Sequence, residues 1–347
     1  MRPFVTQTIV QTLTKDQILP PQISVPLLAV AEHLELPPVA TYAALNLWNF
    51  GSYNEDFTDL DSLVALHTFT GTTDESWFYC VSVAMEAQGA YILPVVLNAL
   101  DAVKLRDYET IIESLDELSL CIEKVASLLD RMHERCDPMV FYHQIRPFLA
   151  GSKNMQAAGL PFGVFYDEGE GRGSWRELRG GSNGQSSLIQ FFDLVLGVNH
   201  TSAGNSRPDQ PGDEASRIRG ESEGAISFHE EIRGYMPGPH RRFLEHVVRK
   251  GHIRGLATLP ATTPEQKRLQ IAYQHATETL AKFRDKHLQI VTRYIVLPSK
   301  QPWMVRRSST ALGQGRKVNE VTGTGGTALL PFLKQVRDET YKAGNLK

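Results

Sequence analysis

One repeating pattern constrains this chain more than any other feature: apolar residues recur at steps of three and four along most of its length. This spacing places them on one face of an α-helix. No run of strands with alternating polar and apolar residues is evident. The pattern predicts an all-α fold, with helices over residues 76–104, 107–135, 138–150, 185–198, 227–253, 264–297 and 327–343.

Composition narrows the class of protein. The 347 residues are 41% hydrophobic, which is enough for a sizeable core in one or two domains. The 36 basic and 39 acidic residues are intermingled, so neither nucleic acid nor a membrane surface is an expected partner. Cys80, Cys121 and Cys136 are odd in number and far apart, which argues against a disulfide framework and favours a reducing compartment.

No segment predicts membrane insertion or export. The longest nearly apolar run, "AYILPVVLNAL", has 11 residues and contains a proline, so it is too short to cross a bilayer. The N-terminal stretch has neither the basic start and apolar core of a signal peptide nor the arginines of a transit peptide. We therefore expect a cytoplasmic protein.

Three polar stretches separate the predicted helices. They cover residues 151–184, 199–224 and 298–326. We expect 199–224 to be a surface insertion and 298–326 to be a mobile loop, because long loops in a helical domain are either disordered or functional. The string "TGTGGT" near the end of the third stretch fits a closing lid, and taken alone it also fits a flexible linker.

A histidine interrupts one apolar stripe. His287 lies among Tyr273, Ala276, Leu280, Phe283, Ile290, Val291, Tyr294 and Leu297. An imidazole in such a place costs about 1–3 kcal/mol for each polar group left without a partner. The pattern alone leaves two explanations, a core histidine bonded to a backbone carbonyl or a ligand of a metal or haem. The 11 histidines form no HExxH motif or other compact zinc constellation.

An arginine among apolar residues is the second unusual feature. The segment "FYHQIRPFLAG" places Arg146 among Phe141, Ile145, Phe148 and Leu149. A guanidinium stays charged, so it must be solvated, paired or able to bind an anion, and its fork of donors suits a carboxylate. Asp137 and Pro138 predict the start of this helix, and Pro147 should kink it or end it early.

Six segments, in this order, resemble the indoleamine 2,3-dioxygenase family. They are "ELPPVATYA", "FYHQIRPFLAG", "GGSNGQSSLIQFFDLVLG", "YMPGPHRRFL", "FRDKHLQIVTRYIVLPSKQ" and "GTGGTALLPFLK". Together they cover the chain from about residue 20 to the end. The resemblance implies a helical haem-binding catalytic domain over 26–347. Residues 1–25 would be a short remnant of the smaller N-terminal domain that family members carry.

The resemblance assigns a cofactor side to the site. His287 falls on the position of the single protein ligand of haem iron, with haem b as cofactor and O2 as co-substrate. The opposite ring nitrogen would then need an acceptor that fixes the ring. Arg284 and Asp193 match a pair that bridges near this side of the haem, although an exposed surface ion pair is the alternative.

Two loops would border the haem and the substrate. "GGSNGQSS" lacks the GK[ST] of a phosphate loop, so it does not predict nucleotide binding. By resemblance the residues at the porphyrin edge and near the substrate amine are Gly181, Ser182 and Asn183. The segment that closes over the substrate would contribute Thr324, Gly325 and Gly326.

The resemblance also assigns a substrate side, formed by Tyr42, Phe78, Ser82, Phe141, Tyr142 and Arg146. Arg146 would grip the α-carboxylate of tryptophan while Phe141 and Tyr142 wall the indole. Phe78 and Ser82 would bracket substrate and oxygen, and Tyr42 would lie at the edge of the pocket. From the residues alone, the aromatic rings also fit ordinary core packing, and Ser82 also fits a helix-interior serine bonded to its own backbone.

The implied activity is that of a haem dioxygenase, an oxidoreductase of tryptophan catabolism in the kynurenine pathway. It would insert O2 across the indole C2–C3 bond of L-tryptophan or a related indoleamine to give N-formylkynurenine, and we expect a monomer. The alternatives are a non-catalytic haem or oxygen-binding relative of the same fold, and a helical scaffold without haem. Besides the short N-terminal segment, three features depart from the family pattern: Tyr142 in place of phenylalanine, Asn183 in place of a smaller residue, and the long insertion at 199–224.

Overall fold

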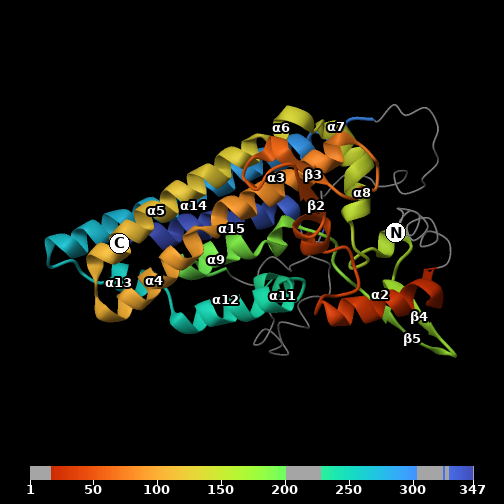
Figure 1. Ribbon diagram of the computed structural model, residues 1–347, viewed down its shortest axis with the longest axis horizontal. Helices are drawn as coiled ribbons and strands as arrows, with labels where there is room; N and C mark the ends of the chain where they lie inside the picture. The colour runs from red at the N-terminus through yellow and green to blue at the C-terminus, as the bar shows by residue number, and fades with distance from the viewer. Residues whose placement is uncertain (1–16, 201–227, 303–322, 325–327, 347) are drawn as a thin grey trace, which may run out of the picture.

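The computed structural model describes residues 17–200, 228–302, 323–324 and 328–346. Long helices run side by side along the molecule, and a small sheet lies beside α2 at one end (Figure 1). The main helices are α2 (Pro21–His33), α3 (Thr73–Ala90), α4 (Ile92–Leu105), α5 (Tyr108–Asp130), α9 (Ser187–Leu196), α11 (Phe228–Arg233), α12 (Gly238–Lys250), α14 (Pro264–Val291) and α15 (Leu329–Gly344). Shorter helices are α6 (Met132–Arg135), α7 (Pro138–Val140), α8 (Arg146–Leu149) and α13 (Arg254–Ala257). The predicted all-α fold is confirmed.

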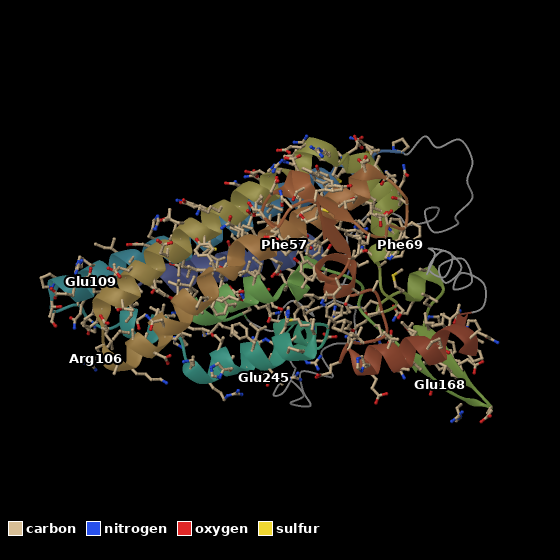
Figure 2. All side chains as sticks on the ribbon, in the orientation of Figure 1. Phe57, Phe69, Arg106, Glu109, Glu168 and Glu245 are labelled. Atoms are coloured by element: carbon tan, nitrogen blue, oxygen red, sulfur yellow. The ribbon has the colours of Figure 1, made fainter. Side chains whose placement is uncertain are left out.

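The core forms where α5 packs against α14, α4 and α3. The buried face of α5 carries Ile111, Leu115, Leu118, Ile122 and Val125, each at most 1% exposed. Burying one such side chain contributes about 1.5–3 kcal/mol, which outweighs the intrinsic preference of any single residue for a helix. Charged side chains on the outer faces, such as Arg106, Glu109 and Glu245, are exposed (Figure 2).

Local signals place the ends of α14 and α9. The Thr263 hydroxyl accepts from the Gln266 amide while the Gln266 side chain reaches back to the Thr263 backbone, and Pro264 occupies the first helical position. Ser186 caps α9, and Gly197 ends it with a φ of 67°, a conformation that favours glycine. These caps set the positions of the two helices that carry His287 and Asp193.

The helix predicted over 76–104 is two helices, α3 and α4, which meet at Tyr91 with a bend of 43°. Pro94 explains the break, because it has no amide hydrogen to donate to the carbonyl of Ala90. Among the described residues no single helix is long and apolar enough to cross a membrane, and only the bent pair α3 and α4 meets the criteria of length and composition together.

The helix predicted over 138–150 is also interrupted. Asp137 caps α7 as expected, accepting from the amides of Met139 and Val140. A π-helical turn then spans Phe141–Ile145 (η3), and α8 ends at Leu149. The widened turn lies just before Pro147, whose ring and missing amide hydrogen disturb the α-helical ladder, in line with the expected kink.

Residues 151–184 are not the continuous loop that the sequence suggested. They contain β4 (Val164–Gly169) and β5 (Arg172–Arg176), an antiparallel hairpin in which Phe165 faces Trp175. β1 (Ile18–Leu19) adds to β4 in parallel, and β2 (Phe50–Ser52) pairs with β3 (Leu63–Ala65). The boundary expected at residue 25 falls inside α2, which contacts β4.

The cysteines are all buried and free. Two predicted segments lie largely outside the described residues: 201–224 of the expected insertion, and 303–322 and 325–326 of the expected loop.

Candidate active site

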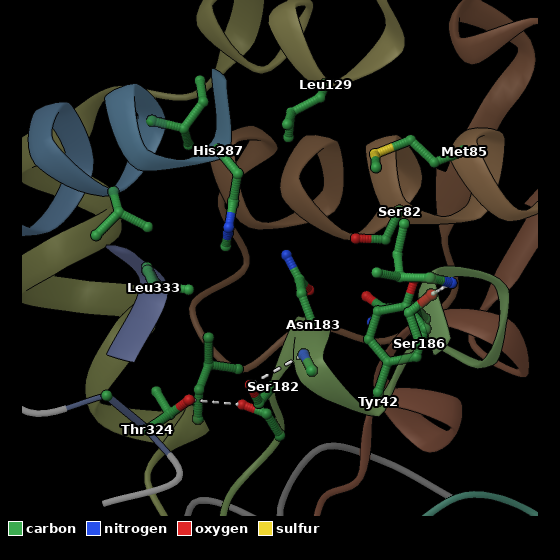
Figure 3. A pocket seen from close by; sticks show the side chains of 18 of the residues that line it. Tyr42, Ser82, Met85, Leu129, Ser182, Asn183, Ser186, His287, Thr324 and Leu333 are labelled. Atoms are coloured by element: carbon green, nitrogen blue, oxygen red, sulfur yellow. Dashed lines mark hydrogen bonds between the residues drawn. The ribbon is translucent and has the colours of Figure 1, made fainter. Parts of the chain in front are cut away.

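A cavity lies between α3, α9, α14, α15 and the segments around Phe141 and Ser182 (Figure 3). The cavity has a volume of about 240 Å³. Most of its wall is apolar. The predicted residues that line it are Tyr42, Phe78, Ser82, Phe141, Arg146, Gly181, Ser182, Asn183, Asp193, Arg284, His287 and Thr324.

His287 points from α14 into this cavity (Figure 3). Within the described residues neither ring nitrogen has a hydrogen-bond partner, so both the backbone carbonyl of the core explanation and the acceptor expected for the second nitrogen are missing. Burial, followed by the positive charge of Arg284, lowers the pKa of His287 to about 4. The imidazole is therefore neutral near pH 7, the form that coordinates a metal.

The stripe around His287 holds along α14 and fails at its end. Phe283, Ile290 and Tyr294 are buried, whereas Leu297 is 50% exposed. The turn Thr292–Val296 (η7) is π-helical. A π turn holds more residues than an α turn, so it rotates the residues after it away from the face that precedes it.

Arg284 and Asp193 form a buried ion pair in the wall of the cavity. Arg284 Nη2 donates to both carboxylate oxygens of Asp193 at 2.7 Å, and Arg284 Nη1 donates to the Thr340 hydroxyl on α15. Each charged side chain is 7% exposed, so an exposed surface pair is ruled out. Through Arg284 the pair joins α14, the helix that carries His287, to α9 and α15.

Two histidines that the sequence did not single out extend this pair. His200 Nε2 lies 3.2 Å from Asp193, and its Nδ1 lies 2.8 Å from Glu339. The His229 ring stacks on His200 at 4.2 Å between centroids. Burial opposes charge on His200, but the carboxylates of Asp193 and Glu339 outweigh it and raise its pKa. Burial, followed by the charge of His200, lowers the pKa of His229 to about 3.

Asp193, His200 and His229 hold their ligand atoms within 4.8 Å of one another, the arrangement of a metal site. Both carboxylate oxygens of Asp193 already accept hydrogen bonds from Arg284. Burial raises the pKa of Asp193, but Arg284 and His200 outweigh burial and hold the pKa below its usual range. Arg284 and the His200 ring thus lie against the carboxylates of Asp193 and Glu339. This cluster is best described as a buried charge network.

Aromatic rings line the cavity near the N-terminal end of α3. Phe78 and Phe141 meet edge to face at 4.9 Å, and Phe141 meets Tyr294 at 5.8 Å. Arg146 lines the cavity, with its guanidinium carbon 5.4 Å from the centre of the Tyr142 ring. Tyr142 itself is not among the lining residues, contrary to expectation. The π turn rotates Tyr142 relative to an α-helix and leaves its ring beside the arginine.

Polar side chains lie on the wall of the cavity across from His287 (Figure 3). Tyr42 donates to Glu86 Oε1 at 3.1 Å, and Ser186 donates to the same oxygen at 2.5 Å. Ser82, one turn before Glu86 on α3, directs its hydroxyl into the cavity and makes no hydrogen bond to its own helix within the described residues (Figure 3). Sequence reasoning missed Glu86, although its position four residues after Ser82 predicts the same helix face.

The loop after Gly180 meets the end of the predicted closing segment. Thr324 Oγ1 donates to the Gly181 carbonyl at 2.9 Å. Asn183 points into the cavity beside Ser182, whose hydroxyl accepts from the Gly184 amide (Figure 3). Gly325 and Gly326 lie outside the described residues. The structure thus brings the two predicted loops together at Gly181.

Comparison with known proteins agrees with this geometry. The family model described as indoleamine 2,3-dioxygenase matches residues 3–343. The chain is 40% identical to indoleamine 2,3-dioxygenase of Saccharomyces cerevisiae, over 96% of this chain and 74% of the relative. It is 39% identical to indoleamine 2,3-dioxygenase nanC of Aspergillus nanangensis, over 94% of this chain and 75% of the relative.

A third relative carries a different substrate in its name. This protein, 6-hydroxytryptophan 2,3-dioxygenase fscD of Fusarium equiseti, is 34% identical over 94% of this chain and 75% of its own length. The histidine in the cavity wall and these matches over nearly the whole chain lead to one conclusion: the chain belongs to the indoleamine 2,3-dioxygenase family, whose members are oxidoreductases.

Proposed function

We propose that the chain is a haem-dependent dioxygenase that opens the indole ring of L-tryptophan, or of a related indoleamine, between C2 and C3 to give N-formylkynurenine. One observation carries the proposal: His287 directs a neutral imidazole without a hydrogen-bond partner among the described residues into a largely apolar cavity. Related indoleamines are included as substrates because relatives differ in the substrate that they are named for.

The residues present fit haem b. Haem binding requires apolar walls and a nitrogen that can hold the iron; Phe283, Ile290 and Leu333 would form such walls, and His287 would hold the iron. When bound, the haem iron supplies the centre at which dioxygen is activated. The charge network of Arg284 and Asp193 holds α14 against α9 and α15, which fixes where the imidazole points.

The protein's task at the substrate is orientation. Arg146 would bind the α-carboxylate through two parallel hydrogen bonds, and Phe78 and Phe141 would contact the flat faces and edges of the indole. Holding the reacting atoms in place lowers the entropic part of the barrier. Thr324, bonded to Gly181, would keep the loop beside the bound substrate and exclude water.

Cofactor binding is tested with the His287→Ala variant. The wild-type protein loaded with haem should show a Soret band that shifts when carbon monoxide is added after reduction. His287→Ala should lose this band, because the variant lacks the imidazole that we propose as the ligand of the iron. His275, which is exposed on the same helix, provides the control variant His275→Ala. Equal haem retention in both variants would disprove the assignment of His287.

Turnover is tested by incubating the reduced protein with tryptophan and oxygen. The product should have gained two oxygen atoms by mass spectrometry. The competing function is a haem or oxygen-binding relative without catalysis, which would give no product. The presence of Arg146 in the cavity wall favours the enzyme, because an oxygen carrier does not need a carboxylate-binding group.

Substrate binding through Arg146 predicts a loss of about 10- to 100-fold in kcat/KM for Arg146→Ala, the worth of a hydrogen bond to a charged group. The exposed Arg249 gives the control Arg249→Ala. Unchanged turnover in Arg146→Ala would show that the carboxylate binds elsewhere. We further propose that the protein acts in the cytoplasm as a monomer, within tryptophan catabolism by the kynurenine pathway.

A further inference from the structure

Glu86 is a cavity residue for which the proposed reaction has no use. It comes from α3 and lines the same cavity as Phe78 and Ser82. Its Oε1 accepts from both Tyr42 and Ser186, so one carboxyl oxygen is held in place by two hydroxyls. Within the described part of the chain, Oε2 has no partner. A fixed carboxyl group therefore presents a free oxygen to a mostly apolar space.

The hydroxyl hydrogens of Tyr42 and Ser186 are both donated to Oε1 of Glu86, so neither is available to Oε2. Ser186 uses its oxygen to cap α9 by accepting from the Ile189 amide, and it gives its hydrogen to Glu86. Tyr42 gives its hydrogen to the same carboxyl oxygen. Burial raises the pKa of Glu86, and burial together with the nearby carboxylate raises the pKa of Tyr42 well above its usual value. The carboxyl group of Glu86 is thus held in place through Oε1, and Oε2 remains as an acceptor.

Position along α3 decides which part of a ligand Glu86 meets. Glu86 lies two turns, or about 12 Å of helix axis, from Phe78. Phe78 contacts Phe141, which begins the π turn that leads into Arg146. Ser82, Ser186 and Tyr42 lie together on the other side, across from His287 (Figure 3). A ligand whose carboxylate is held at Arg146 can reach Glu86 only with its far end.

In a tryptophan-like ligand the far end is the six-membered ring of the indole. The ammonium group is carried by the same carbon atom as the carboxylate, so it stays near Arg146. Glu86 therefore faces carbon atoms of the ring in tryptophan itself. A hydroxyl on that ring would place an O–H donor opposite the free Oε2.

We propose that Glu86, fixed by Tyr42 and Ser186, forms a subsite that selects indoles with a hydroxyl on the six-membered ring. This inference rests on the proposed function, because it assumes a tryptophan-like ligand with its carboxylate at Arg146. A site that hydrogen-bonds a substrate hydroxyl discriminates strongly against an analogue that lacks it. Glu86 would thus determine specificity while the bond-breaking chemistry takes place elsewhere in the cavity.

The test compares hydroxyl with methyl, two groups of similar size. Haem-loaded protein is assayed with tryptophan and with the 5- and 6-hydroxy and 5- and 6-methyl derivatives, and kcat/KM is measured for each. At one ring position at least, the wild type should prefer the hydroxyl to the methyl derivative by about tenfold or more, the worth of a hydrogen bond to a charged group. Calorimetric binding of the same compounds provides a readout that is independent of turnover.

Two variants isolate the carboxyl group. Glu86→Gln keeps an oxygen for Tyr42 and Ser186 but removes the charge, so the preference for hydroxyl should fall about fivefold. Glu86→Met removes both hydrogen-bonding atoms, and the preference should disappear. The matched control is Glu113→Gln, at an exposed glutamate of α5, where the preference should be unchanged. If Glu86→Met does not fold, Glu86→Gln decides the question alone.

The outcomes separate this inference from the proposed function. Failure to oxidise any tryptophan, with hydroxyl selectivity intact in the binding measurement, would refute the reaction and support the subsite. Oxidation of tryptophan with no hydroxyl preference at either position, or with a preference that Glu86→Gln leaves unchanged, would overturn the subsite. A purely structural role for Glu86 would lower stability and leave the ratio of hydroxyl to methyl unchanged, which also overturns it.

Discussion

Asp193→Asn should destabilise the haem-free protein by about 3–5 kcal/mol, the cost of removing one partner from a buried ion pair. The amide has the shape of the carboxylate, so packing is preserved. What changes is the charge: Arg284 loses an anion that it contacts at 2.7 Å through both oxygens, and His200 loses one of its two acidic neighbours. Solvent cannot replace that anion, because the paired side chains are 7% exposed.

The assay is urea unfolding followed by circular dichroism at pH 7. Glu278→Gln is the matched control, because it breaks the Lys282–Glu278 pair on α14, whose side chains are 64% and 53% exposed. This control should change the free energy of unfolding by at most about 1 kcal/mol. High salt should abolish the small effect of the control and leave the Asp193 effect largely intact, because buried pairs are poorly screened.

The effect of pH follows from the direction of the shift. The pKa of Asp193 is lower in the folded protein than in the unfolded chain, where it is about 3.9. Its contribution is therefore complete above that value and is lost as the pH falls towards the folded pKa. A loss below about 1 kcal/mol in Asp193→Asn at pH 7 would refute the claim that this pair anchors α14.

Three further predictions concern stability. The pKa of His229 is about 3 in the folded protein and about 6.5 in the unfolded chain, so between these values only the unfolded chain binds the proton. Lowering the pH from 7 to 5 should therefore reduce the free energy of unfolding by about 2 kcal/mol through this residue. His229→Gln should remove that part of the measured pH dependence. Gly180→Ala should prevent native folding, since its Cβ would lie 1.9 Å from the Leu149 carbonyl oxygen, whereas Gly255→Ala, with 3.7 Å to its nearest neighbour, should be tolerated in the same thermal-unfolding measurement. Thr263→Ala should cost about 1 kcal/mol in urea unfolding by removing the cap of α14, and no loss would show that the cap is dispensable.

Much of the helical framework was predictable because its signals are local. The α14 stripe, the Thr263 cap and the Asp137 cap depend on residues within one or two turns of one another. The predictions failed where one residue changes a regular pattern. Pro94 divides a predicted long helix in two, and the π turn before Pro147 moves Tyr142 out of the cavity wall.

The missed site residues have a different cause. His200 and His229 lie far apart in the sequence, and nothing in the spacing of either one indicates that their rings stack. Glu86 had a local signal, since it lies one turn after Ser82 on α3. Its significance depends on Tyr42 and Ser186, which arrive from other parts of the chain.

Local patterns in the sequence are enough to predict the helical class, the apolar face that contains His287 and the helix that contains Arg146, because periodicity and capping act over a few residues. The packing of the helices, in contrast, decided that His287 faces a cavity without a partner among the described residues and that Arg284 reaches Asp193 and Thr340. It also decided that Glu86 is held by two hydroxyls with one oxygen left free. Contacts of this kind join residues up to about 100 positions apart, and they are set by how helices pack, which depends on the shapes and volumes of many side chains at once.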